Sequence, residues 1–318
     1  MAKLESTTTK NIINENRDDI DDDDDQLNVS YKIVPTIYNT TKTEPHTKNV
    51  PLTKESSTTK VIESNDLNVN IEYLIGKEPE KYIYTPIPKD YLGLVHCTVK
   101  YNKEGLISKT FSLYFNGQNE NDRTFLLTAR KHIRIDGHSE YFIGNDEKSL
   151  KNLNDENSIA KLKGINITST EYILYNQNNQ QSVAVIYDTH IFGSKGPRKI
   201  TVLLYNVEKP IHPLKENETI IEEWRAGRAT DLIEIKNKTP VYNEESKIYS
   251  LALLENHLIQ PSHKNFQLVI TNGDHEEGIV MQFGRIDDNN FALDYRYPLT
   301  AMQAFAIALS SFHNRFRT

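Results

Sequence analysis

The segment LTAMQAFAIALSSF at residues 299–312 constrains the fold more than any other part of the sequence. Its apolar side chains, among them Met302, Phe305 and Ile307, fall on every side of a helical wheel. A helix that is apolar all round has to be buried on all sides, and this one is too short for the roughly 20 residues that cross a bilayer. We therefore predict a helix in the interior of the folded domain.

Strand patterns dominate the chain from about residue 81 onward. Apolar residues alternate with polar ones in many short runs, for example at 95–101, 111–115, 183–187 and 200–204, and Asn–Gly or Asp–Gly turn pairs separate several of them. Period-two alternation predicts antiparallel strands that bury one face. A closed barrel with the apolar helix inside satisfies both patterns most simply, and a two-layer sandwich with the helix at one end is the alternative.

The N-terminal part has a different composition. Seven aspartates lie between Asp18 and Asp25, and residues 1–80 carry a net charge of −7, so residues 81–318 sum to zero. Clusters of Thr, Ser, Asn and Lys surround the acidic run, and such composition rarely supports a packed core. We predict a disordered, acidic, low-complexity tail over residues 1–75 and one folded domain over 76–318. Two less polar patches, at 31–38 and 67–75, are either apolar spots within a disordered tail, which we favour, or short docking motifs.

Several classes of activity lack support in the sequence. Cys97 is the only cysteine, which excludes an intramolecular disulfide framework and a cysteine-based zinc cluster. We find neither a nucleophile elbow nor a convincing set of metal ligands. We therefore expect no catalytic residues, no metal and no cofactor, and a protein that is not an enzyme. Because the N-terminus lacks the apolar core of a signal peptide, we expect a soluble intracellular protein.

Five short sequence segments resemble segments of the tubby family, in the same order and with the same spacing. They are GSKGPRKI (193–200), IEIKNKTPVYN (233–243), KNFQLV (264–269), VMQFGRI (280–286) and DYRYPLTAMQAFAIALSSF (294–312). The resemblance spans roughly residues 81–318. It implies a twelve-stranded antiparallel β-barrel threaded by its hydrophobic C-terminal helix. It also implies binding of phosphatidylinositol 4,5-bisphosphate, a tether to the plasma membrane and an adaptor role, in cilia for some members and with a proposed nuclear role for others.

The resemblance also implies a headgroup site. The family strand that reads Ile-Gly-Lys-Leu-Arg is matched by SIAKLKG, which assigns its two cationic positions to Lys161 and Lys163. Period-two spacing places both side chains on one face of a strand. A lysine at 163 keeps the charge but loses the two-pronged grip of arginine on phosphate, so we expect weaker binding.

Two positions depart from the family pattern. The phosphate-contacting Asn falls on Glu140, or on Ser139 if the alignment slips by one residue, and the third basic position falls near Asn179. We expect compensation from two basic clusters, which also have the alternative interpretation of ordinary solvated surface. Their members are Arg130, Lys131, His132 and Arg134 in one cluster and Lys195, Arg198 and Lys199 in the other.

The leading hypothesis is a monomeric adaptor that binds the bisphosphorylated lipid by electrostatic attraction, with little apolar insertion. We expect it in the cytoplasm and on the inner face of the plasma membrane, with a cilium or the nucleus as further locations, and with unknown protein partners for the tail. One alternative is a nuclear regulator of transcription, but a neutral domain with an acidic tail disfavours nucleic acid as a partner. Another is a scaffold whose lipid site has degenerated.

Overall fold

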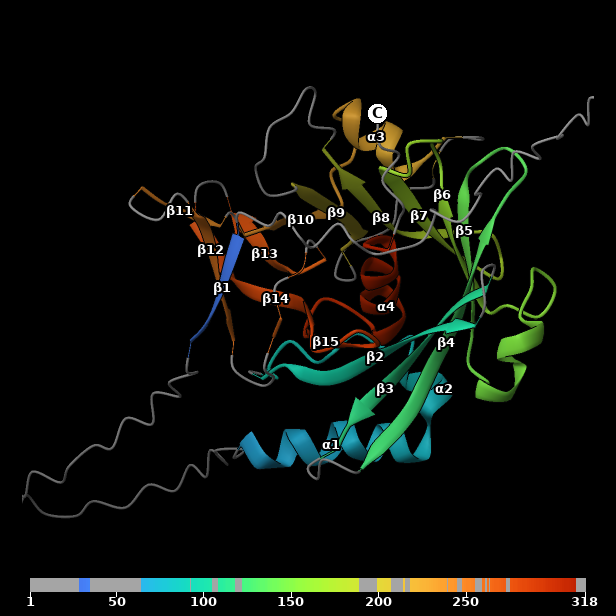
Figure 1. The fold of residues 1–318 in the computed structure, drawn as a ribbon, viewed down its shortest axis with the longest axis horizontal. Helices are drawn as coiled ribbons and strands as arrows, with labels where there is room; N and C mark the ends of the chain where they lie inside the picture. Colours follow the sequence, from blue (N-terminus) through green and yellow to red (C-terminus); the bar gives the residue numbers. More distant parts are fainter. Residues whose placement is uncertain are drawn as a thin grey trace, which may run out of the picture.

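A twelve-stranded antiparallel barrel encloses the C-terminal helix α4 (Ala301–Ser310) in the computed structural model (Figure 1). The structure describes residues 29–34, 64–91, 93–104, 108–117, 122–188, 199–206, 214, 218–238, 240–244, 248–254, 259–260, 262, 264–272 and 275–312. The predicted barrel with an internal helix is confirmed, and the sandwich alternative is wrong.

Each strand of the barrel pairs with two antiparallel neighbours, and β9 closes the ring on β10. In order around the ring the strands are β10 (Leu232–Asn237), β13 (Phe266–Asn272), β14 (His275–Arg285), β15 (Asn290–Tyr295), β2 (Val95–Glu104), β3 (Ser108–Asn116), β4 (Arg123–Ile133), β5 (Ser139–Gly144), β6 (Ala160–Gly164), β7 (Glu171–Asn176), β8 (Gln181–Tyr187) and β9 (Ile200–Tyr205).

Helix α4 fills the interior of this ring. Phe305 and Ile307 have no exposed surface, as the all-round apolar pattern requires. A capping box starts the helix, because Thr300 Oγ1 accepts from the Gln303 N–H at 3.1 Å while Gln303 Oε1 accepts from the Thr300 N–H at 3.1 Å. Beyond its C-terminal end, the Phe312 ring lies 4.8 Å from the Phe111 ring between centroids. The helix is therefore fixed at both ends.

Two helices that precede the barrel strands in the sequence pack against the barrel core. These are α1 (Ser64–Lys77) and α2 (Pro79–Tyr82), and Ile71 and Ile75 of α1 are almost fully buried. The Tyr82 hydroxyl lies 2.8 Å from the Tyr295 hydroxyl. The predicted domain boundary at residue 76 thus falls inside a helix that already contacts the core. Apart from this helix and one strand, the predicted tail lies outside the described residues, and its disorder stays a prediction.

A small second sheet lies beside the barrel, at the left in Figure 1. It comprises β11 (Val241–Asn243), β12 (Ile248–Leu254) and β1 (Val29–Val34), in the order β1-β12-β11. Strand β1 pairs with β12 in parallel, which differs from the antiparallel arrangement expected throughout. Apolar residues at 249, 251 and 253 alternate as they do in the barrel strands, yet they belong to a strand outside the ring, because alternation identifies a strand without indicating its sheet.

Helix α3 (Ile220–Arg225) covers part of the outer surface of the barrel. Ile220 and Ile221 bury themselves against Ile173, Ala184 and Leu203, which point outward from β7, β8 and β9. This small outer core holds α3 against the barrel. The outer face of β4, β5 and β6, by contrast, carries charged side chains such as Arg130, Lys161 and Lys163.

Candidate functional site

Strand β6 turns both predicted lysines outward. Ala160, Leu162 and Gly164 are buried, whereas Lys161 and Lys163 between them are partly exposed. Leu162 belongs to the core around α4, so the two lysines lie on the outer surface of the barrel. The period-two prediction for this pair is confirmed.

Strand register arranges the outer side chains of β4–β7 in two rows. The first row passes through Arg130, Phe142, Lys161 and Tyr175, and the second through His132, Glu140, Lys163 and Ile173. Adjacent strands are about 4.8 Å apart, so the backbones of Arg130 and Lys161 are separated by about 10 Å, with Phe142 between them. Long cationic side chains at that spacing can reach one ligand that carries two phosphates.

Three cations therefore share this face: Arg130, Lys161 and Lys163, which we call the cationic face. The Lys163 ammonium lies 5.1 Å from the centroid of the Tyr175 ring, a cation–π distance. The His132 ring lies 5.9 Å from the Phe142 ring. The Tyr175 ring thus lies against one of the three cations, a contact that the sequence pattern does not predict.

Asp155 is an unexpected acidic member of the site. It lies in the turn that follows the short helix η2 (Glu147–Asn152), and its carboxylate forms an ion pair with the Lys161 ammonium. That hydrogen bond, with the nearby charges of Lys161 and Lys163, lowers the pKa of Asp155 below its ordinary value. A carboxylate therefore already lies where a phosphate of a ligand would compete for Lys161.

Glu140 lies directly across from Lys163 in the β5–β6 pair. Ser139, the alternative from a one-residue slip, is buried, and its hydroxyl lies 3.3 Å from the Ser169 hydroxyl. The structure therefore places the carboxylate on the cationic face and directs the serine elsewhere. Asn179 lies in the exposed β7–β8 turn with φ of 58°, and it brings no positive charge.

Lys131 does not join the cationic face, although it neighbours Arg130 in sequence. Its ammonium donates to the Phe312 carbonyl at 2.8 Å and lies 5.6 Å from the Tyr141 ring centroid, and the residue is 7% exposed. Alternation along β4 sends consecutive residues to opposite faces, which a cluster read from sequence ignores. Lys131 instead binds the end of the segment that contains α4.

The second predicted cluster falls partly outside the described residues, which exclude Arg198 and Lys195. Lys199 is exposed beside the start of β9, and its carbonyl accepts from the Asp188 N–H at 3.1 Å. Because β9 lies three places from β6 around the ring, the structure does not bring Lys199 to the cationic face.

In the described part of the chain, no three or more His, Cys, Asp and Glu side chains gather as metal ligands would. None of the helices described there has the length and apolar character needed to cross a membrane. Cys97 is fully buried in β2.

Comparison with known proteins decides the family. A sequence profile described as the Tub family matches residues 83–314, well over half of the chain. The chain belongs to the Tub family. Its members include the mouse Tubby-related protein 3, which is 35% identical over 258 residues, covering 74% of this chain and 54% of that protein.

Relatives in invertebrates match the same part of this Tub-family chain. The Caenorhabditis elegans Tubby protein homolog 1 is 33% identical over 249 residues, which cover 70% of this chain and 57% of that protein. Protein king tubby of Drosophila sechellia is 33% identical over 252 residues, or 74% of this chain and 55% of its own length. The match thus covers little more than half of each relative.

Proposed function

We propose that this Tub-family protein binds phosphatidylinositol 4,5-bisphosphate through the cationic face and so tethers to the inner face of the plasma membrane as an adaptor, without catalysis. The observation that carries the proposal is the convergence of Arg130, Lys161 and Lys163 on one outward surface across three adjacent strands. The apolar barrel interior and α4 form a rigid support behind that surface.

Electrostatics and geometry together support a headgroup ligand. A hydrogen bond between a charged donor and phosphate contributes roughly 1.5–3 kcal/mol, and several are available from three cations. Such binding weakens as salt rises, since the screening length falls to about 8 Å at physiological ionic strength. The cationic face is about one headgroup wide, which suits a bisphosphate better than an extended polyanion.

Three features reduce the affinity that we expect. Lys163 replaces the family arginine, Asp155 competes for Lys161, and Glu140 lies across from Lys163. These same features favour a second candidate, a scaffold whose lipid site has degenerated. The two differ in one measurable respect, because a working site depends on its lysines and a degenerate one does not.

Vesicle co-sedimentation tests the proposal. The full chain is mixed with vesicles of a neutral lipid to which one anionic lipid is added. The added lipid is either about 5% phosphatidylinositol 4,5-bisphosphate or enough phosphatidylserine to give the same negative charge. Lys161→Ala/Lys163→Ala is compared with Lys236→Ala/Lys238→Ala, which removes the same charge at the same spacing near β10, four places around the ring. We expect the wild type to bind the bisphosphate-containing vesicles selectively, and only the Lys161→Ala/Lys163→Ala variant to lose this binding. Equal binding by the two double variants, or binding of the wild type to phosphatidylserine vesicles alone, would refute the proposed site.

A further inference from the structure

Three isoleucines project into solvent at one end of the strands that carry the cationic face. They are Ile133 at the end of β4, Ile135 in the β4–β5 turn and Ile167 in the β6–β7 turn, with exposures of 58%, 110% and 59%. In the described part of the chain six large apolar side chains are exposed, and half of them lie here. Isolated exposed apolar residues are ordinary, but a group of them indicates an interaction site.

The two turns that carry these isoleucines contact each other. The Ser139 hydroxyl, at the start of β5, lies 3.3 Å from the Ser169 hydroxyl in the β6–β7 turn. A Cβ atom placed on Gly137 would lie 3.9 Å from Cγ2 of Ile167. These contacts hold the two turns next to each other, so the three exposed isoleucines lie at the same end of the strands, and we call them the isoleucine tip (Ile133, Ile135 and Ile167).

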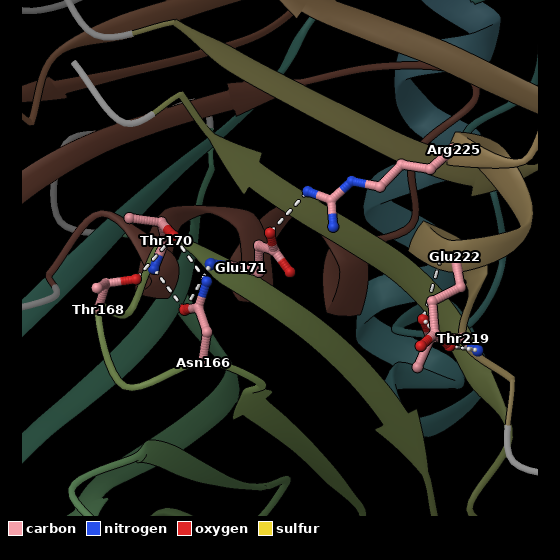
Figure 2. A network of polar contacts seen from close by, with 7 residues as sticks. All are labelled: Asn166, Thr168, Thr170, Glu171, Thr219, Glu222 and Arg225. Atoms are coloured by element: carbon pink, nitrogen blue, oxygen red, sulfur yellow. Dashed lines mark hydrogen bonds and ion pairs between the residues drawn. The ribbon is translucent and has the colours of Figure 1, made fainter. Parts of the chain in front are cut away.

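Hydrogen bonds fix the turn that carries Ile167. Figure 2 shows Asn166 accepting from the backbone N–H of Thr170 at 2.9 Å and donating to the Thr170 hydroxyl at 2.7 Å. In the next strand, Glu171 accepts from Arg225 of α3 at 2.7 Å. The exposed isoleucine is thus presented by an ordered turn, so little conformational entropy is lost when it meets a partner.

The hairpin that carries Ile135 is also ordered. The Gly137 N–H donates to the Arg134 carbonyl at 2.9 Å, and Gly137 has φ of 85°, a conformation that suits glycine. Asp136 accepts from the His138 N–H at 3.1 Å and pairs with Arg134 at 3.0 Å. The Arg134 charge is therefore partly balanced by that of Asp136.

Lys163 lies immediately before the β6–β7 turn, so the cationic face continues directly into the isoleucine tip. An exposed apolar tip near cations complements the boundary between anionic headgroups and acyl chains, where aliphatic groups enter and cations remain at the surface. A nucleic acid offers no matching apolar surface. The exposed apolar side chains and the nearby positive charge thus favour an anionic bilayer as the binding partner.

We propose that the isoleucine tip inserts into the interfacial layer of an anionic bilayer while Lys161 and Lys163 hold a headgroup beside it. This inference rests on the proposed function and replaces the expectation of little apolar insertion, which followed from sequence patterns that do not reveal surface exposure. Apolar insertion is not screened by ions, so it adds a component of membrane affinity that persists at high salt.

Serine substitutions separate the two components. Ile133→Ser/Ile135→Ser/Ile167→Ser removes the apolar tip without touching a buried side chain, so the fold is retained. We expect about a tenfold loss of partitioning onto bisphosphate-containing vesicles, with the larger relative loss at high salt. The Lys161→Ala/Lys163→Ala variant should instead lose most of its binding at low salt. The affinity of the serine variant for soluble inositol trisphosphate should equal that of the wild type.

A fluorescent probe measures insertion directly. Cys97 is fully buried, so an environment-sensitive dye on Ile135→Cys labels one position, and Lys236→Cys on β10 is the matched control. Quenching by lipids brominated near the headgroup at position 135 alone is the expected result. If bound protein shows no quenching at 135 and the serine variant partitions like the wild type, insertion is refuted while lipid binding stands. If the wild type does not bind the vesicles, both proposals fall.

Discussion

Replacement of Ile307 by alanine tests whether α4 is the central support of the barrel. Ile307 lies in the middle of α4 and has no exposed surface. The change removes Cγ1, Cγ2 and Cδ1, which costs about 2.4 kcal/mol at about 0.8 kcal/mol for each buried carbon. The space left unfilled raises the cost towards 5 kcal/mol where the surrounding barrel cannot collapse, so we expect a loss of about 2–5 kcal/mol.

The same chemical change on the surface is the control. Ile135→Ala removes identical atoms from a fully exposed side chain, and we expect a change within about 0.5 kcal/mol. Urea unfolding followed by both tyrosine fluorescence and circular dichroism gives the two free energies of unfolding. A loss below about 1 kcal/mol for Ile307→Ala, or equal losses for both variants, would refute the placement of α4 inside the barrel.

Three further predictions concern single polar groups. Asp155→Asn removes the carboxylate that pairs with Lys161, so binding to bisphosphate-containing vesicles should become about two- to fivefold tighter. The control Asp288→Asn, in the β14–β15 turn, should change this binding little. Weaker binding by Asp155→Asn would contradict a competing role. Hydrogen bonds from the Asn290 side chain, with backbone N–H groups of Asn289 and Asn290, lower the pKa of Asp287. The stabilising contribution of the ionised Asp287 is therefore complete above about pH 4 and is lost as pH falls through the lower folded-state pKa. The wild type should accordingly lose stability over that range more steeply than Asp287→Asn. Parallel curves of unfolding free energy against pH for the two proteins would contradict this. Thr300→Ala removes the side-chain cap of α4 and should cost about 1 kcal/mol in urea unfolding, and an unchanged midpoint would show that the cap is dispensable.

The main architecture could be predicted from sequence because burial leaves a direct pattern. A helix that is apolar on all sides has few places to lie, and α4 occupies the interior as expected. Period-two alternation likewise placed Lys161 and Lys163 on one outward face. The same rule separates Lys131 from Arg130, a distinction that a list of neighbouring basic residues obscures.

Other parts of the site depend on contacts that no local pattern encodes. Asp155 forms an ion pair with Lys161 from a turn outside β6, and the spacing of the two residues in the sequence does not predict this contact. Phe142 and Tyr175 read as ordinary strand residues until the register places them beside the cations. Helix α1 buries Ile71 and Ile75 against the core, but polar residues stand between its apolar ones, so its composition resembled that of the tail.

The most direct test of the central claim is calorimetric titration with inositol 1,4,5-trisphosphate, the soluble equivalent of the lipid headgroup. The wild type, Lys161→Ala/Lys163→Ala and Lys236→Ala/Lys238→Ala are titrated at low and physiological salt. The cationic face predicts binding by the wild type and the β10 control, weaker at higher salt, and at least about tenfold weaker binding without Lys161 and Lys163. Equal affinities in all three proteins, or none in the wild type, would contradict it.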